Sequence, residues 1–331
     1  MTKQKGMALV LVLWIISLLT IMAGSFALSM RRETAITVGI KNNAQALAVA
    51  ESGVAIAELM LLNPDQNQRW RADGSIYEII ANNATIRVRL LSETGKVDIN
   101  KADQVLLEAL MATIPSEAEQ KAKLVGAIID WRDADDLLHS DGAEKDDYKQ
   151  AGLSYQPSNK AFQALEELQL VLGMNEALYL QLEPLITIYS GQSTVSVQQA
   201  AKEVLQILPG LDTSLIETYM TARLESALNN LPMPPFPASP ELASIVEQPV
   251  AFGQTNVLTL VSEAQLNDES SAVISVTIKQ ADPLAMQNTK ALQSPFQVLK
   301  WQQVTSNERS LFVDAMSELL VKTYAEPELN N

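Results

Sequence analysis

The sequence predicts an α+β protein in which a large helical segment separates two strand-forming segments. An uncharged run without proline extends from Gly6 to Met30 at the start of the chain. Helical periodicity fills the middle of the chain, and short alternating segments precede and follow it. With 331 residues, the chain is long enough for a membrane anchor and one or two folded domains.

The N-terminal apolar run predicts a membrane-spanning helix. Lys3 and Lys5 stand just before the run, and Arg31 and Arg32 close it. About 20 apolar residues cross the hydrocarbon core of a bilayer as a helix. A secretory signal peptide is the alternative, but its apolar core would be only about 7–15 residues long and would end at a small-residue cleavage site. Here the run continues past such residues at 23–25, which favours a retained membrane helix.

The helical pattern continues beyond the anchor. No residue breaks it before Asn63 and Pro64, so we expect one rod from Met7 to Leu62, about 84 Å long at 1.5 Å per residue. An ordinary anchor followed by an unrelated helix is the alternative. Apolar and small residues recur at spacings of three and four and form one stripe: Ile40, Ala44, Leu47, Ala50, Val54, Ala57 and Leu61.

Composition excludes several functions. The net charge is −15, from 39 acidic and 24 basic side chains, and such a chain repels nucleic-acid phosphates. The absence of cysteine rules out disulfides and thiolate chemistry. The single histidine, His139, is expected to be an exposed loop residue. Since no acid and base pair can be nominated, we do not expect an enzyme.

Two blocks of the chain form an internal repeat. The first is Thr94–Leu110 and the second is Ser193–Leu211, displaced by 98 positions. Each is expected to start extended and lead into a helix, with Asn100 and Gln198 capping the free amides. The matched apolar positions are Val97, Ile99, Ala102, Leu106, Leu107 and Leu110 with Val195, Val197, Ala200, Val204, Leu205 and Leu208.

The remaining elements follow from local patterns. Between the two repeats the pattern is helical throughout, as in Glu117–Trp131 and Ala161–Leu172. Leu228–Pro249 contains six prolines and is expected to be a linker that ends the helical part. The predicted strands are Thr85–Leu91, Val257–Ser262, Ala272–Lys279 and Phe296–Val304. Residues 305–331 show a short helical pattern and a polar, acidic tail.

Eight carboxylates crowd into the stretch Asp130–Tyr148. So many can converge only if they are protonated or bind a cation, and Ca²⁺ accepts six to eight oxygen ligands from flexible loops. The spacing is not that of an EF-hand, and a solvated acidic loop is the alternative. Trp131, Leu137 and Leu138 within the stretch favour an ordered loop. The candidate ligands of one Ca²⁺ ion are Asp133, Asp135 and Asp136 from one end, and Glu144, Asp146 and Asp147 from the other.

A turn in the second repeat resembles a helix-hairpin-helix DNA-binding turn. It has the sequence ILPGL at 207–211, with Arg223 downstream. Such a turn needs basic residues facing phosphate, whereas Asp212 and Glu217 lie beside this one. We therefore expect a structural hairpin and no nucleic-acid partner.

The N-terminal sequence KGMALVLVLWIISLL resembles the class III signal of type IV pilin-like precursors. Further motifs are GKVDIN, AIIDWRDADD, GAEKDDY, FQALEELQLVLGM and the second repeat. With them, the chain resembles the minor pseudopilin K family of the type II secretion system. The likeness runs from Lys5 to about Arg223, and the C-terminal third is similar only in layout.

This resemblance implies cleavage by a prepilin peptidase between Gly6 and Met7, followed by methylation of Met7. It also implies a pilin-like antiparallel sheet with an inserted all-α domain, and bound Ca²⁺. The expected division of the chain is a leader at 1–6, a transmembrane helix at 7–30, a pilin-like helix and first strand at 31–92, the helical insert with its repeat at 93–250, and the C-terminal β part and tail at 251–331.

The family caps the tip of the pseudopilus, with minor pseudopilins I and J and other pseudopilins as partners. The resemblance thus implies a structural role in protein secretion across the outer membrane of a Gram-negative bacterium, with contacts to secreted proteins. The helix would cross the inner membrane once, with the C-terminal domain in the periplasm. Leu11 replaces the glutamate of ordinary pilins, as is usual for this subtype. A minor pilin of a type IV pilus and a membrane-anchored helix-hairpin-helix DNA-binding protein are the alternatives.

Overall fold

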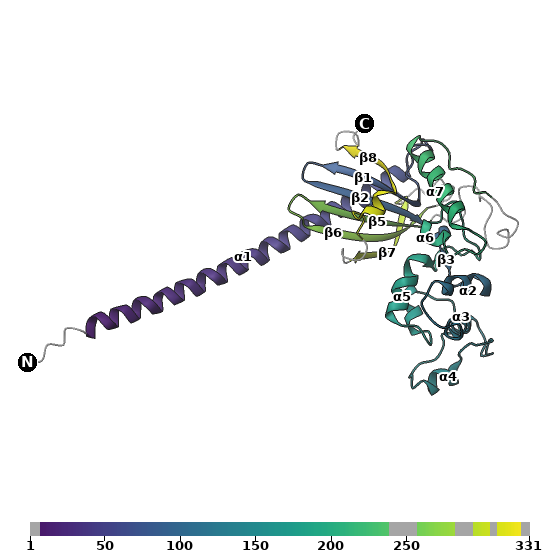
Figure 1. Ribbon diagram of the computed structural model, residues 1–331, viewed down its shortest axis with the longest axis horizontal. Helices are drawn as coiled ribbons and strands as arrows, with labels where there is room; N and C mark the ends of the chain where they lie inside the picture. Colours follow the sequence, from purple (N-terminus) through teal and green to yellow (C-terminus); the bar gives the residue numbers. More distant parts are fainter. Residues whose placement is uncertain (1–6, 238–256, 282–293, 305–309, 326–331) are drawn as a thin grey trace, which may run out of the picture.

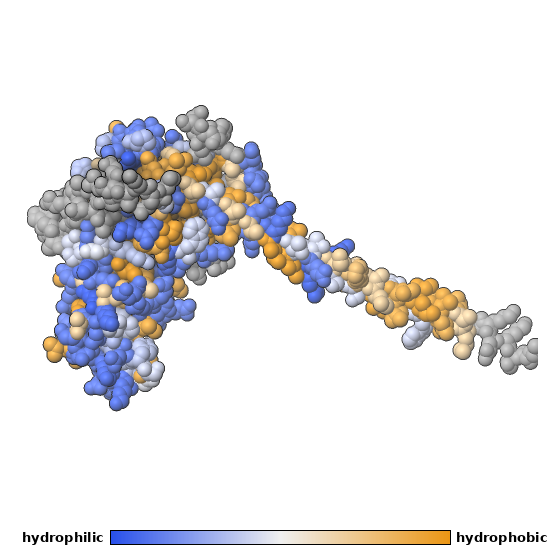
Figure 2. Space-filling model, turned by 180° about the vertical axis from the view of Figure 1, so that it is seen from behind, coloured by the Kyte–Doolittle hydropathy of each residue, from blue (hydrophilic) through white to orange (hydrophobic). Residues whose placement is uncertain are grey.

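A single long helix, α1 (Met7–Leu61), dominates the computed structural model, which describes residues 7–237, 257–281, 294–304 and 310–325. The expected continuous rod is confirmed, because α1 runs unbroken from the apolar segment into the folded part of the chain (Figure 1). Its first half is apolar and stands free of the rest of the chain (Figure 2). Of the helices in these ranges, α1 alone is long and apolar enough to cross a membrane.

A six-stranded sheet receives the second half of α1. Its strands are β1 (Asp73–Ala81), β2 (Ala84–Ser92), β5 (Val257–Leu266), β6 (Ser271–Gln280), β7 (Phe296–Val304) and β8 (Leu320–Ala325). They lie in the order β7-β6-β5-β2-β1-β8. All neighbours are antiparallel except β8, which runs parallel to β1. The α+β class is confirmed, and the sheet is mixed because of this one edge strand.

Small residues let α1 lie close to the sheet. Ala46, Ala50, Gly53 and Ala57 are buried on the face of α1 that contacts the strands. A Cβ atom at Gly53 would lie 2.3 Å from the Ser262 Oγ, which itself donates a hydrogen bond of 2.8 Å to the Ala50 carbonyl. Ala50 and Ala57 belong to the predicted stripe, but Ile40 and Ala44 in that stripe are exposed, and Ala46 and Gly53 were not predicted.

The chain leaves the sheet at the end of β2 and returns at the start of β5. The intervening elements are η1 (Glu93–Gly95), β3 (Val97–Asp98), α2 (Gln104–Ala112), α3 (Ala118–Arg132), α4 (Lys145–Gln150), η2 (Leu165–Leu170), α5 (Glu176–Leu182), η3 (Glu183–Leu185), β4 (Ile186–Thr187), α6 (Lys202–Leu205) and α7 (Thr213–Leu228). They enclose a hydrophobic core separate from the one between α1 and the sheet. We call this part the insert.

The insert lies at the membrane-distal end of the sheet. Ala84 at the start of β2 packs with Ala46 in α1, whereas Leu90 near the end of β2 shares a core with Ala57. Strand β2 therefore runs in the same sense as α1, away from the membrane-spanning half. The insert begins where β2 ends, and it lies on the side of the sheet opposite to the N-terminus (Figure 1).

The internal repeat is confirmed. In the first copy the Ala102 N–H donates to the Asp98 carbonyl at 2.7 Å, and in the second the Ala200 N–H donates to the Ser196 carbonyl at 2.9 Å. In both copies a turn then leads into a short helix, α2 or α6, whose matched leucines and valine are buried. The same 98-residue displacement therefore relates the hydrogen bonds as well as the side chains.

The predicted caps are wrong. Asp103 caps α2 by accepting from the Leu106 N–H at 2.9 Å. Asn100 instead exchanges two hydrogen bonds with the backbone of Phe162, and no side chain caps α6. Asn100 lies one turn too early because a tight turn at 99–101 separates the extended residues from the helix.

The other predicted elements have mixed outcomes. Strands β2, β5, β6 and β7, helix α3 and the end of the helical part at Leu228 are confirmed. Continuous helix between the repeats is wrong, since residues 151–164 form no helix and η2 is a short 3₁₀ segment. The expected C-terminal tail contains helix α9 (Asp314–Ser317) and then strand β8.

Candidate metal centre

The acidic stretch forms an ordered loop between α3 and α4. Asp130 lies in the last turn of α3, and Asp133 is the residue at which α3 ends. Glu144 precedes the first turn of α4, and its N–H donates to the Asp147 Oδ2 at 2.9 Å. The two helix ends therefore bring Asp133 and Glu144 to the base of the same loop.

Asp130 folds the loop back onto α3. Its carboxylate is fully buried and accepts from the Ala143 N–H at 2.8 Å through Oδ2. Oδ1 accepts from the His139 N–H at 3.2 Å and lies 2.6 Å from His139 Nδ1. A Cβ atom at Gly142 would come within 1.9 Å of the Asp130 Oδ2. Glycine at this position therefore lets the loop approach Asp130.

The carboxylate oxygens of Asp133 and Glu144 are buried, although the Asp133 side chain as a whole is 23% exposed. Both oxygens of each carboxylate have no hydrogen-bond partner in the described ranges. The Asp133 Oδ2 lies 3.3 Å from His139 Nδ1, which is already bonded to Asp130. Burial without compensation is costly for a carboxylate. These four oxygens are therefore free to bind a cation.

Burial and neighbouring negative charges raise the pKa of both groups. For the Asp133 carboxyl the chief cause is burial, followed by the charges of Asp135 and Asp130. For the Glu144 carboxyl, burial is again the chief cause of the raised pKa, followed by the charges of Asp130 and Asp133. Like charges thus converge here.

The other predicted ligands have different roles. The Asp135 Oδ1 accepts from the Leu137 N–H at 2.9 Å, and Asp147 binds the Glu144 N–H. Asp136 accepts from the Asn159 Nδ2 at 2.7 Å. Asp146 is exposed in the first turn of α4. The structure therefore brings Asp133 and Glu144 together, places Asp136 beside them and leaves Asp146 on the surface.

Sequence reasoning missed three residues of this site. Asn159 joins the loop from outside the acidic stretch, and its Oδ1 is buried without a partner in the described ranges. Asp130 and His139 offer ligand atoms that lie within 4.8 Å of one from Asp133. His139 is partly exposed, as expected, but its ring contacts Asp130. The position of Asp130 at the end of a predicted helix was the available signal.

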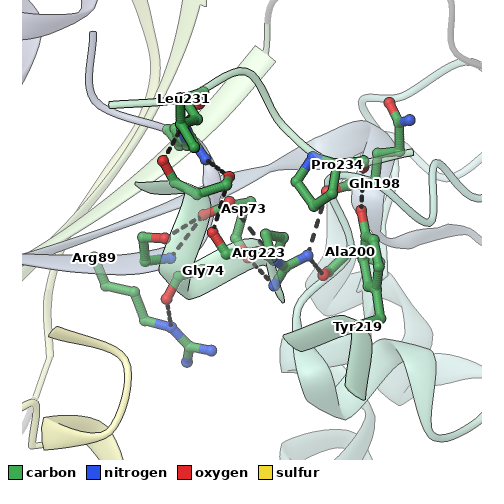
Figure 3. A network of polar contacts seen from close by, with 12 residues as sticks. Asp73, Gly74, Arg89, Gln198, Ala200, Tyr219, Arg223, Leu231 and Pro234 are labelled. Carbon is green, nitrogen blue, oxygen red and sulfur yellow. Dashed lines mark hydrogen bonds and ion pairs between the residues drawn. The ribbon is translucent and has the colours of Figure 1, made fainter. Parts of the chain in front are cut away.

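The turn at 207–211 does not present Arg223 to a ligand. Arg223 is buried and donates to the carbonyls of Ala200 and Asp73, each at 2.7 Å (Figure 3). Asp212 caps α7 by accepting from the Leu215 N–H. Arg223 thus joins the second repeat to the start of β1, in agreement with a structural hairpin.

The processing site lies at the edge of the described chain. Gly6 falls outside the described residues, and Met7 is the first residue of α1. Leu11 follows one turn later and is exposed on the free half of the helix. The apolar surface continues through this turn.

Comparison with known proteins shows similarity to one family. The family model described as "Type II secretion system (T2SS), protein K" matches residues 84–191, which run from β2 through the acidic loop to just beyond β4. The type II secretion system protein K of Klebsiella pneumoniae is 26% identical over 68% of this chain and 76% of its own length. The chain is therefore similar to the type II secretion system protein K family, which supports the resemblance seen in the sequence.

A further relative and one solved structure are also similar to this chain. The protein K of Aeromonas hydrophila is 24% identical over 81% of this chain and 92% of its own length. A crystal structure titled as the GspK-GspI-GspJ complex from the type 2 secretion system of enterotoxigenic Escherichia coli has 18% identity and a TM-score of 0.47, with 84% of this chain and 99% of that chain covered. These similarities support a minor pseudopilin of type II secretion, and among the described helices α1 has the length and composition of a membrane anchor.

Proposed function

We propose that this protein K caps the tip of the type II secretion pseudopilus, with its folded part in the periplasm. The observation that carries the proposal is the place of the insert, which lies at the membrane-distal end of the sheet. A subunit added above this one would meet the insert before it reached α1. The role is structural, since the insert acts by occupying space.

Leu11 supports a terminal position. A subunit above this one would bring its terminal amine next to α1, and Leu11 offers that amine no carboxylate. Burying an unpaired amine is costly. The proposed partners are therefore the minor pseudopilins I and J beside and below this subunit, and other pseudopilins further down.

Assembly is proposed to follow cleavage by the prepilin peptidase between Gly6 and Met7. Mass spectrometry of the membrane-extracted protein should then give an N-terminus at Met7. Substitution Gly6→Ala should block cleavage, because the peptidase site takes the smallest residue. An N-terminus at Ser25 or beyond would instead indicate ordinary signal-peptide removal.

Antibody labelling of pseudopili by electron microscopy tests the capping role. We expect label against this subunit at one end of each filament, and label against the major subunit along its length. Substitution Leu11→Glu places a carboxylate in the membrane helix at a cost of about 2.5–3.5 kcal/mol and should not improve secretion. Label against this subunit along the length of filaments would contradict the capping role.

We further propose that the acidic loop binds Ca²⁺. Asp133 and Glu144 supply four buried oxygens without hydrogen-bond partners, and Asn159 Oδ1 is a further one nearby. Carboxylate and amide oxygens are the ligands that Ca²⁺ prefers. Asp135, Asp136, Asp146 and Asp147 add negative charge around them. The ion would supply the positive charge that this loop lacks, and would hold α3 and α4 together.

A further inference from the structure

A small pocket at the β8 edge of the sheet is lined by three basic side chains and, among the described residues that line it, by no acidic one. Its volume is about 190 Å³. It lies between the loop that follows α1, the strands β1 and β8, and the C-terminal end of α7 (Figure 1). The basic side chains are Arg69, Arg71 and Lys322. We call this cavity the basic pocket, and it is unexpected in a chain with a net charge of −15.

Two of the three cations are held in place by neutral partners. Arg71 Nη1 donates to the Ser226 Oγ at 2.7 Å, and its Nη2 donates to the carbonyls of Ser226 and Leu231. Lys322 Nζ lies over the Tyr324 ring, 4.7 Å from its centre. Backbone carbonyls at a helix C-terminus and aromatic faces attract cations without neutralising them. These contacts therefore fix both charges at the walls of the pocket and leave them uncompensated.

No carboxylate of the described residues forms an ion pair with any of the three cations. Arg69 donates through Nε to the Asn63 carbonyl, whereas its Nη1 and Nη2 and the Lys322 Nζ donate no hydrogen bond within this part of the chain. Asp65 is the one acidic residue of the loop after α1, and it accepts from the Asn67 N–H at 3.0 Å and does not line the pocket. Cations that converge without a counterion create a positive potential, which attracts an anion.

We propose that the basic pocket binds a phosphate group. Its volume equals that of about six water molecules at about 30 Å³ each, and pockets for larger organic ligands have about 300 Å³ or more. The ligand is therefore a small anion. Three positive charges are balanced better by a phosphate, with a charge of about −1.5 to −2 at pH 7, than by a carboxylate with one. Guanidinium groups also match the spacing of phosphate oxygens.

The headgroups of the membrane that α1 spans are too distant to supply this phosphate. Residues 31–61 of α1 extend about 46 Å beyond the membrane-spanning segment at 1.5 Å per residue, and the loop that carries Arg69 follows the end of α1. The phosphate group is thus that of free inorganic phosphate or of a small monoester. Once bound, it would link this loop and β8 to the end of α7, and so would fasten the last helix of the insert to the sheet.

Titration calorimetry of the full chain in detergent tests the inference, with Ca²⁺ left out so that no calcium phosphate forms. We expect saturable binding of inorganic phosphate that weakens at high ionic strength, with competition by sulfate but not by acetate. A second titration uses glycerol 3-phosphate. Tighter binding of this compound would assign the pocket to a monoester, and equal or weaker binding would assign it to inorganic phosphate.

A pair of double variants locates the binding. Arg69→Gln with Lys322→Gln should weaken phosphate binding at least about tenfold. Lys101→Gln with Lys149→Gln removes the same charge from exposed positions of the insert and should leave it unchanged. Arg71 is kept in both because it contacts the end of α7. Lys322→Gln alone alters an exposed side chain and should also weaken binding, which covers the case in which the Arg69 change disturbs the loop.

The inference does not depend on the capping role or on Ca²⁺. Absence of saturable phosphate binding by the unaltered chain would overturn it. Equal weakening in the two double variants would overturn it as well, because the affinity would then reflect net charge and not the pocket.

Discussion

The insert contains two groups of carboxylates with buried oxygens, and they differ in whether the protein itself compensates their charge. Glu93 is only 2% exposed. Its Oε1 accepts hydrogen bonds from Lys96 Nζ at 2.6 Å and from Thr259 Oγ1 at 2.7 Å. Its Oε2 accepts a hydrogen bond from Thr187 Oγ1. Asp133 and Glu144 bury all four of their oxygens without a hydrogen bond. One charge is compensated within the protein, and the other two are not.

This difference distinguishes the structural contact at Glu93 from the proposed binding site in the acidic loop. Glu93 joins the sheet, through Thr259 in β5, to the insert, through Thr187 in β4, and Lys96 neutralises it. In the acidic loop, neighbouring carboxylates raise the pKa of both Asp133 and Glu144, although the His139 ring also lies 3.3 Å from Asp133. A buried charge is retained only when it is paired or coordinated. The proposed Ca²⁺ would supply the compensating charge at the loop, whereas Lys96 supplies it at Glu93.

The largest effect is expected from Glu93→Ala. Removing one partner of a buried ion pair leaves the other charge uncompensated, at a cost of about 3–5 kcal/mol. Denaturant unfolding of the chain in detergent should show this loss of stability. Glu119→Ala removes an exposed ion pair with Lys123 and should lower stability far less, because solvent screens exposed pairs. Equal losses of stability in the two variants would mean that the buried contacts of Glu93 do not stabilise the junction between the sheet and the insert.

Calcium removal is expected to have the next largest effect. A ligand that binds only the folded state stabilises it by about 2.7 kcal/mol at a hundredfold excess over Kd. The melting temperature should therefore fall by several degrees in chelator. Ca²⁺ should restore it, and Mg²⁺ should do so less well, because Mg²⁺ requires near-ideal octahedral geometry. A melting curve that is the same with and without chelator would show that the loop needs no ion.

Neutralising the acidic loop should change stability in the opposite direction from altering Glu93. In chelator, Asp133→Asn with Glu144→Gln removes the repulsion among neighbouring carboxylates and should raise stability. Glu93→Gln should lower it, since Lys96 loses its partner. The double variant should no longer respond to Ca²⁺. If both changes destabilised the chelated protein, the two regions would not differ as described.

The smallest effect concerns pH. The folded-state pKa values of Asp133 and Glu144 lie above their usual values, so the folded protein takes up protons there. Their contribution to stability is fully present below the unfolded pKa values of about 4 and is lost as the pH rises through the raised folded values. Chelated protein should therefore become relatively more stable on mild acidification. With Ca²⁺ bound this gain should vanish, because protons compete with the ion.

The sequence predicts most of the fold where patterns are local. The uninterrupted run that forms α1, the small-residue stripe and the 98-residue repeat are all visible in the sequence. Strand β1 is not, because Ile76, Tyr77 and Ile79 are all buried and produce no alternation. Strand β8 forms only by pairing in parallel with β1 across more than 200 residues, which no local pattern encodes.

For the candidate site, too, local sequence patterns do not show which contacts form in the folded structure. The density of carboxylates identifies the stretch, but it does not indicate which oxygens remain free. Asp135 and Asp147 accept hydrogen bonds from nearby backbone amides, whereas Asp133 and Glu144 lie where α3 and α4 converge. Asn159 reaches the loop from more than twenty residues along the chain. Only the folded structure distinguishes these groups.

Calcium titration calorimetry on the full chain in detergent tests the central difference most directly. We expect saturable binding by the unaltered chain, its loss in Asp133→Asn with Glu144→Gln, and its retention in Asp146→Asn, where the altered carboxylate is exposed. Absence of heat at millimolar Ca²⁺, or unchanged binding in the double variant, would contradict the assignment of the buried oxygens to a calcium site.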